Sequence, residues 1–139
     1  MVDRPQIGVG AIVLNDERIL LVLRGKAPNA RQWAIPGGRQ RLGETLQEAA
    51  VREVLEETGI VIRAGEVIYT TEFIERNVAG TGDYHYVILD LAADYVQGEL
   101  HAGDDALDAR WVAFSELEQL PVNASTSKAL RHLYPEKFI

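Results

Sequence analysis

The apolar residues of the chain fall in short runs rich in β-branched and aromatic side chains, and these runs predict strands. They cover residues 7–14, 19–23, 33–35, 61–75, 84–95 and 109–114. The polar stretch 15–18 separates the first two runs and predicts a hairpin, while residues 77–83 predict a longer one. The sequence Pro36-Gly37-Gly38 is expected to end the third strand. Loops are expected at 25–32, 39–44 and 98–108.

Two segments have the pattern of helices. Residues 45–58 begin with a capping box formed by Thr45 and Glu48, and Gly59 follows where a left-handed C-terminal cap is favoured. Residues 124–133 form the second helix, preceded by Asn123, and residues 115–118 begin a helical turn. Because strands come in runs with helices between them, the fold class is α+β with a mixed sheet rather than a doubly wound α/β fold.

Composition narrows the classes of protein to which the chain could belong. Its 139 residues suit one domain, 1–139, with a single core. The formal net charge of -7 argues against binding to a nucleic-acid polymer, which draws affinity from neutralised phosphates. No apolar run reaches the ~18 residues of a membrane helix, and the run 7–14 reads as a strand rather than a signal segment. We therefore expect neither a nucleic-acid polymer nor a membrane as partner.

The absence of cysteine excludes disulfides, thiol chemistry and cysteine-bound metals. It is compatible with a reducing cytoplasm, where we expect the protein to reside. The sequence leaves open whether the chain forms a homodimer.

Charge is distributed unevenly along the first half of the chain. Residues 18–43 contain no acidic side chain but six basic ones, and a glutamate-rich segment follows at once. A cationic stretch beside an anionic one suggests phosphate bound by side chains and by a metal. A solvated surface of mixed charge is the alternative. Arg24, Lys26 and Arg39 are candidate phosphate contacts, with Arg39 the best placed of the three.

The glutamates of segment 45–58 are unusual because of where helix geometry puts them. At roughly 100° per residue, Glu53 and Glu57 share the apolar stripe, and Glu56 lies beside it. The stripe contains Leu46, Ala49 and Ala50, and a second apolar arc contains Val51, Val54 and Leu55. Burying an unpaired carboxylate costs several kcal/mol, about ten times the cost of an exposed like-charge pair.

Arg52 is able to pair with one of these glutamates, which leaves a surplus of negative charge for a divalent cation. Oxygen ligands without cysteine or paired histidine favour Mg²⁺ or Mn²⁺ over zinc. The helix is therefore interpreted as a metal-binding helix. The alternative is an ordinary charged amphipathic helix.

The segment from Gly38 to Ile60 resembles the signature of the Nudix hydrolases, G-x5-E-x7-R-E-U-x-E-E-x-G-U, where U is a bulky aliphatic residue. All nine specified positions match: Gly38, Glu44, Arg52, Glu53, Val54, Glu56, Glu57, Gly59 and Ile60. The flanking sequences WAIPGG and ARWVAFSEL are also similar to Nudix sequences. The resemblance implies an α/β/α sandwich with a central mixed β-sheet.

The resemblance also implies roles for particular residues. Glu53, Glu56 and Glu57 would bind Mg²⁺ or Mn²⁺, with help from the backbone carbonyl of Gly37. Arg52 would orient Glu53, and Glu44 would brace the loop or reach a metal through water.

The group that takes the proton from the attacking water is, in this family, either a glutamate of the signature or an acid from a later loop. Glu99, Asp104 and Asp105 lie in such a loop. We choose Asp105, with a role as a turn residue as its alternative.

The implied reaction is hydrolysis of a nucleoside diphosphate linked to another group. The chain is most similar to small bacterial ADP-ribose pyrophosphatases, so ADP-ribose is the expected substrate, although residues 70–77 lack the proline that better-defined ADP-ribose enzymes carry. The first alternative is a mutator-type (d)NTP pyrophosphatase. The second is a non-catalytic module that senses nucleotides, which would not need an intact Glu53.

Overall fold

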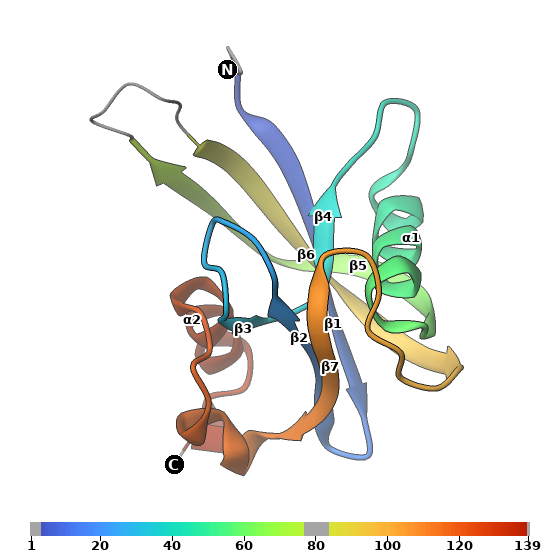
Figure 1. Cartoon of the computed structure of the whole chain (residues 1–139), viewed down its shortest axis with the longest axis vertical. Helices are drawn as coiled ribbons and strands as arrows, with labels where there is room; N and C mark the ends of the chain where they lie inside the picture. The colour runs from blue at the N-terminus through green and yellow to red at the C-terminus, as the bar shows by residue number, and fades with distance from the viewer. Residues whose placement is uncertain (1–3, 77–83, 139) are drawn as a thin grey trace.

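The computed structural model describes residues 4–76 and 84–138, which form seven strands, two α-helices and two 3₁₀ helices (Figure 1). The strands are β1 (Gln6–Asn15), β2 (Arg18–Arg24), β3 (Trp33–Ala34), β4 (Gly37–Arg39), β5 (Val61–Glu75), β6 (Tyr84–Gln97) and β7 (Ala106–Ala113). The helices are α1 (Leu46–Thr58), η1 (Phe114–Gln119), α2 (Ala124–Leu133) and η2 (Pro135–Phe138). Among the described residues, no helix is both long enough and apolar enough to cross a bilayer.

The strands form one mixed sheet with the order β3-β2-β1-β6-β5, in which β4 also pairs with β1 and β7 with β2. Strands β1 and β6 run parallel, and the remaining pairs are antiparallel. Strand β1 is therefore the centre of the sheet. Its register places Gly10 opposite Gly37 of β4 on one side and Asp90 of β6 on the other.

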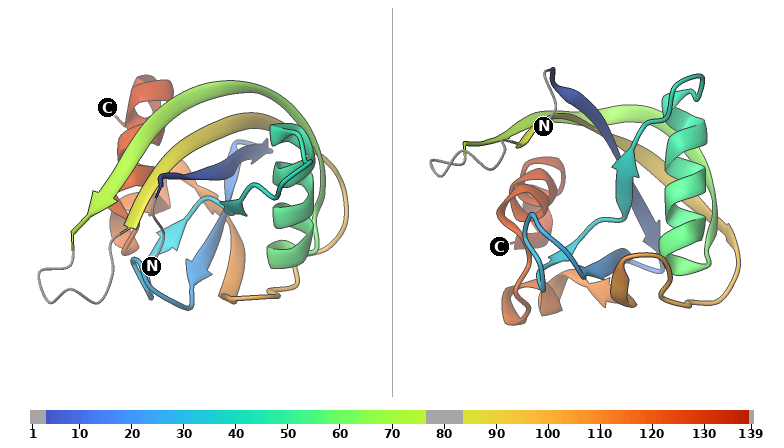
Figure 2. Two further views of the ribbon diagram at one scale, coloured as in Figure 1. Left: turned by 90° about the horizontal axis from the view of Figure 1, so that it is seen from above. Right: turned by 45° about the horizontal axis from the view of Figure 1, so that its top comes forward.

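Two hydrophobic clusters cover opposite faces of the sheet, because alternate side chains of a strand point to opposite faces. Val9, Ala11 and Val13 of β1 pack in the cluster beneath α1, whereas Ile12 belongs to the cluster beneath η1 and α2. Figure 2 shows α1 and α2 on opposite sides of the strands, with β5 and β6 arching across them. The expected α+β class and the α/β/α sandwich are therefore confirmed.

The strongest local signals of the sequence are confirmed by the structure. Helix α1 starts at an N-cap, Thr45, whose side chain accepts the backbone N–H of Glu48, and it ends at Gly59 in the left-handed conformation. Helix α2 begins after Asn123, whose side chain caps Thr126. The predicted hairpins β1–β2 and β5–β6 are present, and the turn predicted at 77–83 lies outside the described residues.

Several boundaries predicted from the sequence are wrong. The third strand ends before Pro36, as predicted, but Gly37–Arg39 then form a further strand, β4, so Arg39 lies in a strand rather than a loop. Glycine permits this pairing: a Cβ on Gly37 would collide with the carbonyl of Val9. Residues 106–108, also predicted as loop, begin β7. Leu55 is 48% exposed and so does not belong to a buried arc, although Val54 does.

Candidate active site

Glutamates in the C-terminal half of α1 lie against the backbone of β4. The side chain of Glu53 is only 12% exposed, and its carboxylate lies so close to Gly38 that any Cβ at that position would collide with it. Gly38 therefore has a steric role: it lets a carboxylate approach the main chain of β4. Glycine is the residue that permits such a close approach.

Arg52 connects the loop before α1 with the glutamates of the helix. Its guanidinium donates through Nε and Nη2 to the carboxylate of Glu44, the Nη2–Oε1 distance being 2.9 Å. Nη1 donates to Glu53, and Nη2 donates to the carbonyl of Arg39 at 3.0 Å. The Arg52 hydrogen bonds, with that from the Arg41 backbone, lower the pKa of Glu44 to about 2. Glu44 thus stays ionised and holds Arg52, which in turn orients Glu53.

Glu57 is the most buried acid of the helix, with 9% exposure, and it accepts a hydrogen bond from the backbone N–H of Gly37 at 2.9 Å. Burial raises the pKa of Glu57 to about 8, the Gly37 hydrogen bond opposes this, and the nearby charge of Glu53 adds to it. A cation beside this carboxyl would stabilise its ionised form. Gly37, expected to contribute its carbonyl to a metal, is therefore a direct neighbour of one predicted ligand.

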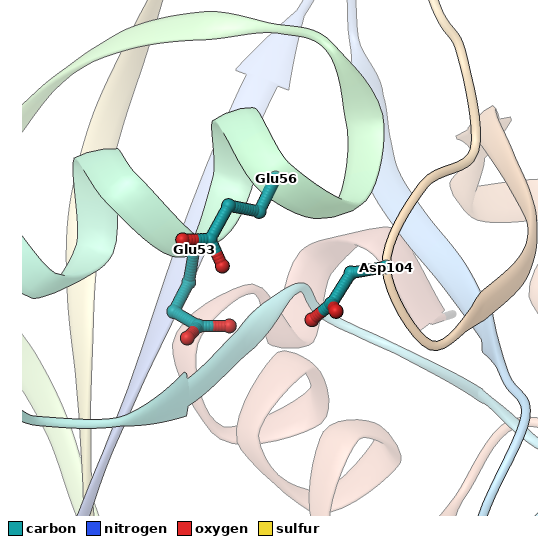
Figure 3. A group of neighbouring side chains, drawn as sticks. All are labelled: Glu53, Glu56 and Asp104. Atoms are coloured by element: carbon teal, nitrogen blue, oxygen red, sulfur yellow. The ribbon is translucent and has the colours of Figure 1, made fainter.

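The loop between β6 and β7 brings a further acid to the glutamates. One carboxylate oxygen from each of Glu53, Glu56 and Asp104 lies within 4.8 Å of the other two. Figure 3 shows the side chain of Asp104 reaching from this loop toward the two glutamates of α1. Asp105, chosen from the sequence, instead pairs with Lys26 at 2.7 Å.

These residues fit a hard divalent cation. The converging ligands are all carboxylate oxygens, which Mg²⁺ and Mn²⁺ prefer, and the chain has no cysteine to favour a softer metal. Arg52 reaches both Glu53 and Glu56, the latter at 3.5 Å, yet it also serves Glu44. Arg41 also lies 3.9 Å from Glu56, but two guanidinium groups do not neutralise Glu44, Glu53, Glu56 and Asp104 together, and a metal would neutralise the remainder.

The acids lie in a cleft of about 1330 Å³ that also contains the predicted phosphate contacts Arg24, Lys26 and Arg39. Of these, Arg24 donates from Nε to the carbonyl of Pro28 at 2.7 Å, and its charge acts to lower the pKa of Glu57. Lys26 is held by Asp105, and Arg39 is exposed. The structure thus brings all three cations and the glutamates to one cavity.

The far wall of the cleft is built by β5 and β6. Phe73, Tyr84 and Tyr86 line the cleft, and the two tyrosine rings stack with centroids 6.4 Å apart. Thr71 and Ile88 continue this wall toward the centre of the sheet.

Two acids of the cleft were not selected from the sequence. Asp104 was considered beside Asp105, and only the conformation of the loop, in which Asp104 has a φ of 53°, distinguishes them. Asp90 was overlooked, although it interrupts the otherwise apolar run VILDLAA. A carboxylate in the middle of a buried strand was the available signal for it.

Comparison with known proteins agrees with this geometry. The sequence model of the NUDIX domain matches residues 4–133. An ADP-ribose pyrophosphatase of Methanocaldococcus jannaschii is 36% identical over 117 residues, which are 84% of this chain and 65% of that protein. The chain therefore spans less than two thirds of this relative.

Two further proteins are similar to the chain. A Bacillus subtilis protein named provisionally as an 8-oxo-dGTP diphosphatase is 55% identical over 53 residues, 37% of this chain and 34% of that protein. The crystal structure of a MutT NUDIX hydrolase from Burkholderia pseudomallei superposes with a TM-score of 0.80 at 32% identity, covering 93% of this chain and 98% of that one.

Proposed function

Since the chain belongs to the Nudix hydrolase family, we propose that it is a metal-dependent pyrophosphohydrolase acting on a nucleoside diphosphate derivative, with ADP-ribose as the favoured substrate. The observation that carries this proposal is the convergence of Glu53, Glu56 and Asp104 in a cleft that is also lined by four lysine and arginine side chains. Acids that share a metal and cations that contact phosphate are the two elements that cleavage of a diphosphate requires.

The metal would be Mg²⁺ or Mn²⁺, held by the carboxylates of Glu53, Glu56 and Glu57 and by the carbonyl of Gly37. When bound, such an ion lowers the pKa of a coordinated water and neutralises charge on phosphate oxygens. The protein itself is acidic and would otherwise repel a polyanionic substrate.

The side chains around the acids would position the reactants. Arg52 holds the Glu53 carboxylate through Nη1 while Glu44 fixes the other nitrogens of the guanidinium, so Glu53 has little freedom to rotate. Arg24, Lys26 and Arg39 would bind the phosphate oxygens. Water would attack phosphorus, the P–O bond to the leaving phosphate would break, and the water proton would pass to a carboxylate oxygen.

The proton acceptor is assigned to Asp104 rather than Asp105. Asp104 is the loop acid nearest the glutamates, whereas Asp105 is engaged by Lys26. In this assignment Asp105 has a positioning role, since it holds a lysine that would contact phosphate.

ADP-ribose is favoured because the M. jannaschii protein is similar over 84% of this chain. The runner-up is a mutator-type (d)NTP pyrophosphatase, which the 55% identity to the B. subtilis protein over 53 residues favours. That match covers little more than a third of the chain, so it bears less on the walls that would contact a base or sugar.

The test is an assay of the purified protein with Mg²⁺ and with Mn²⁺ over ADP-ribose, the four dNTPs, 8-oxo-dGTP, NADH and dinucleoside polyphosphates. We expect ADP-ribose to yield AMP and ribose 5-phosphate. Release of a nucleoside monophosphate and pyrophosphate from a triphosphate, with ADP-ribose intact, would support the runner-up instead. If no compound is hydrolysed with either ion, the proposed function is wrong.

A further inference from the structure

Asp90 is a buried acid that the proposed chemistry does not use. It lies in the middle of β6, is 4% exposed, and lines the cleft. Its Oδ1 atom is buried and, among the residues that the structure describes, has no hydrogen-bond partner. A buried acceptor without a hydrogen-bond donor costs free energy, so its presence needs an explanation. A hydrogen bond from a bound ligand would provide one.

The space around Asp90 is created by a glycine. Gly10 lies opposite Asp90 in the register of β1 and β6, and a Cβ on Gly10 would stand 2.5 Å from Oδ1 and 2.9 Å from Cδ1 of Ile35. Any other residue at position 10 would therefore displace the carboxylate or Ile35. The strand pairing thus leaves room for this side chain to lie across the backbone of β1.

The chemistry of the surroundings favours a flat, neutral ligand. Ile88 and Tyr86 share the face of β6 with Asp90, and Ile35 and Phe73 also line the cleft. Apolar and aromatic walls suit a ring, while the carboxylate would repel a phosphate group. Burial alone raises the pKa of Asp90 to about 6.

An amino group is the donor best matched to such a carboxylate. The exocyclic amino group of a nucleobase has two N–H donors and its nitrogen does not accept, whereas a sugar hydroxyl also brings acceptor lone pairs to the carboxylate. Asp90 shares one cleft with the glutamates, so a nucleotide bound there would place its phosphates and its base in the same cavity.

We propose that Asp90 determines base specificity by accepting a hydrogen bond from an exocyclic amino group, so that the site prefers adenine or cytosine to hypoxanthine or uracil. This inference rests on the proposed function, because it assumes that the cleft binds a nucleotide. It goes beyond the proposed function by naming the class of base and the residue that selects this base.

The test compares the binding of AMP with IMP, and of CMP with UMP, to the full-length protein by isothermal titration calorimetry. In each pair the amino group is replaced by a carbonyl and the neighbouring ring nitrogen gains a hydrogen, so a carboxylate placed against the amino group would face a carbonyl instead. We expect the wild-type protein to prefer the amino member of at least one pair by about tenfold to a hundredfold, the range of a single buried hydrogen bond.

Asp90→Asn is the informative variant, since an amide can donate to a carbonyl where a carboxylate cannot. It is expected to reduce the preference to less than about threefold, chiefly by improving the binding of IMP or UMP. Asp94→Asn is the matched control, because Asp94 is an exposed acid on the same strand, and it should leave the preference unchanged. Melting temperatures of both variants confirm that they are folded.

Three outcomes would overturn the inference: no amino preference in the wild-type protein, an unchanged preference in Asp90→Asn, or an equal loss of affinity for all four nucleotides, which would indicate a sugar contact. The absence of any binding would count against it as well. The wild-type comparison stands even if Asp90→Asn fails to fold. Hydrolysis of ADP-ribose without base preference would sink this inference alone, whereas a lack of all hydrolysis would sink the proposed function.

Discussion

Two regions of the same cleft hold carboxylates in opposite electrostatic situations. At the α1 end, Glu44 and Glu53 are bound by Arg52, and the hydrogen bonds from that arginine are the main cause of the lowered pKa of Glu44, about 2. At the centre of the sheet, Asp90 has no partner among the described residues, and burial raises its pKa to about 6. In the first region Arg52 holds the carboxylates of Glu44 and Glu53 in place, although burial raises the pKa of the neighbouring Glu57 to about 8. The second region has a buried acceptor that a ligand could satisfy.

This difference separates two tasks that a hydrolase must perform. Fixed carboxylates give a metal site that does not reorganise during the reaction, which is how enzymes stabilise developing charge. An unpartnered group gives discrimination, because a ligand lacking the matching donor leaves it unsatisfied. The comparison predicts that changes at the α1 end reduce turnover for every substrate, and that changes at Asp90 alter the ranking of substrates.

The largest effect is expected from Glu53→Gln, which keeps the size of the side chain but removes its charge. We expect kcat to fall by about 10³-fold on the best substrate, within the range for a group that handles charge or protons in the transition state. Turnover of ADP-ribose measured by released AMP checks this. Glu66→Gln, an exposed change on β5, is the control and should leave kcat unaltered. Wild-type turnover in the Glu53→Gln variant would show that the α1 end has no catalytic role.

Arg52→Ala should lower both turnover and stability, because it leaves Glu44 and Glu53 without their common partner. We expect about a 100-fold loss of kcat and a destabilisation of about 1–2 kcal/mol, below the value for a fully buried pair since these side chains keep some solvent contact. Arg52→Lys should recover only part of the lost turnover and part of the lost stability, because an ammonium group lacks the planar, forked donors of a guanidinium. Urea denaturation and steady-state kinetics measure the two effects. Full recovery by lysine would show that charge alone, not orientation, is what Arg52 provides.

Asp104→Asn and Asp105→Asn distinguish two neighbouring acids. Removing the charge of Asp104, which faces the glutamates, should reduce kcat by about tenfold to a hundredfold. Removing the charge of Asp105 frees Lys26 from its ion pair. Because the pair is exposed, this change should mainly raise KM by a few-fold. The same ADP-ribose assay provides both constants. If Asp105→Asn has the larger effect on kcat, the assignment from the structure is wrong and the choice from the sequence is right.

The smallest effect is the pH dependence of stability at Asp90. Since burial raises the folded-state pKa to about 6 from 3.8, the fold favours the protonated acid, and its contribution is lost as pH rises through about 6. Asparagine cannot ionise. Asp90→Asn should therefore gain about 1–2 kcal/mol over the wild-type protein between pH 4 and pH 8. Thermal melts at both pH values check this, and an unchanged difference would mean that Asp90 has a partner in solution.

The two regions also differ in how far the sequence reveals them. The α1 end is encoded locally: the capping box, the spacing of Glu53, Glu56 and Glu57 and the terminal glycine all lie within one helix, so periodicity predicts them. The pairing of Gly37–Arg39 with β1 was missed, because glycine is disfavoured in strands and its steric reason lies in a distant strand.

The sequence marks Asp90 as an acid within an apolar run, but it does not reveal which residues lie around it. Its proximity to Gly10 arises from a parallel pairing between residues 80 positions apart, which no local pattern specifies. Likewise, adjacent acids in a loop differ only in the direction of their side chains, so Asp104 and Asp105 were not distinguishable before the loop conformation was known.

The central claim, that the carboxylates of α1 bind a divalent cation, is tested most directly by titrating Mn²⁺ into the protein and following free Mn²⁺ by electron paramagnetic resonance. The wild-type protein should deplete the free signal, and a variant carrying both Glu53→Gln and Glu56→Gln, shown to be folded by its melting temperature, should not. Identical binding curves for the two proteins, or a wild-type protein that leaves the free Mn²⁺ signal unchanged, would contradict the account.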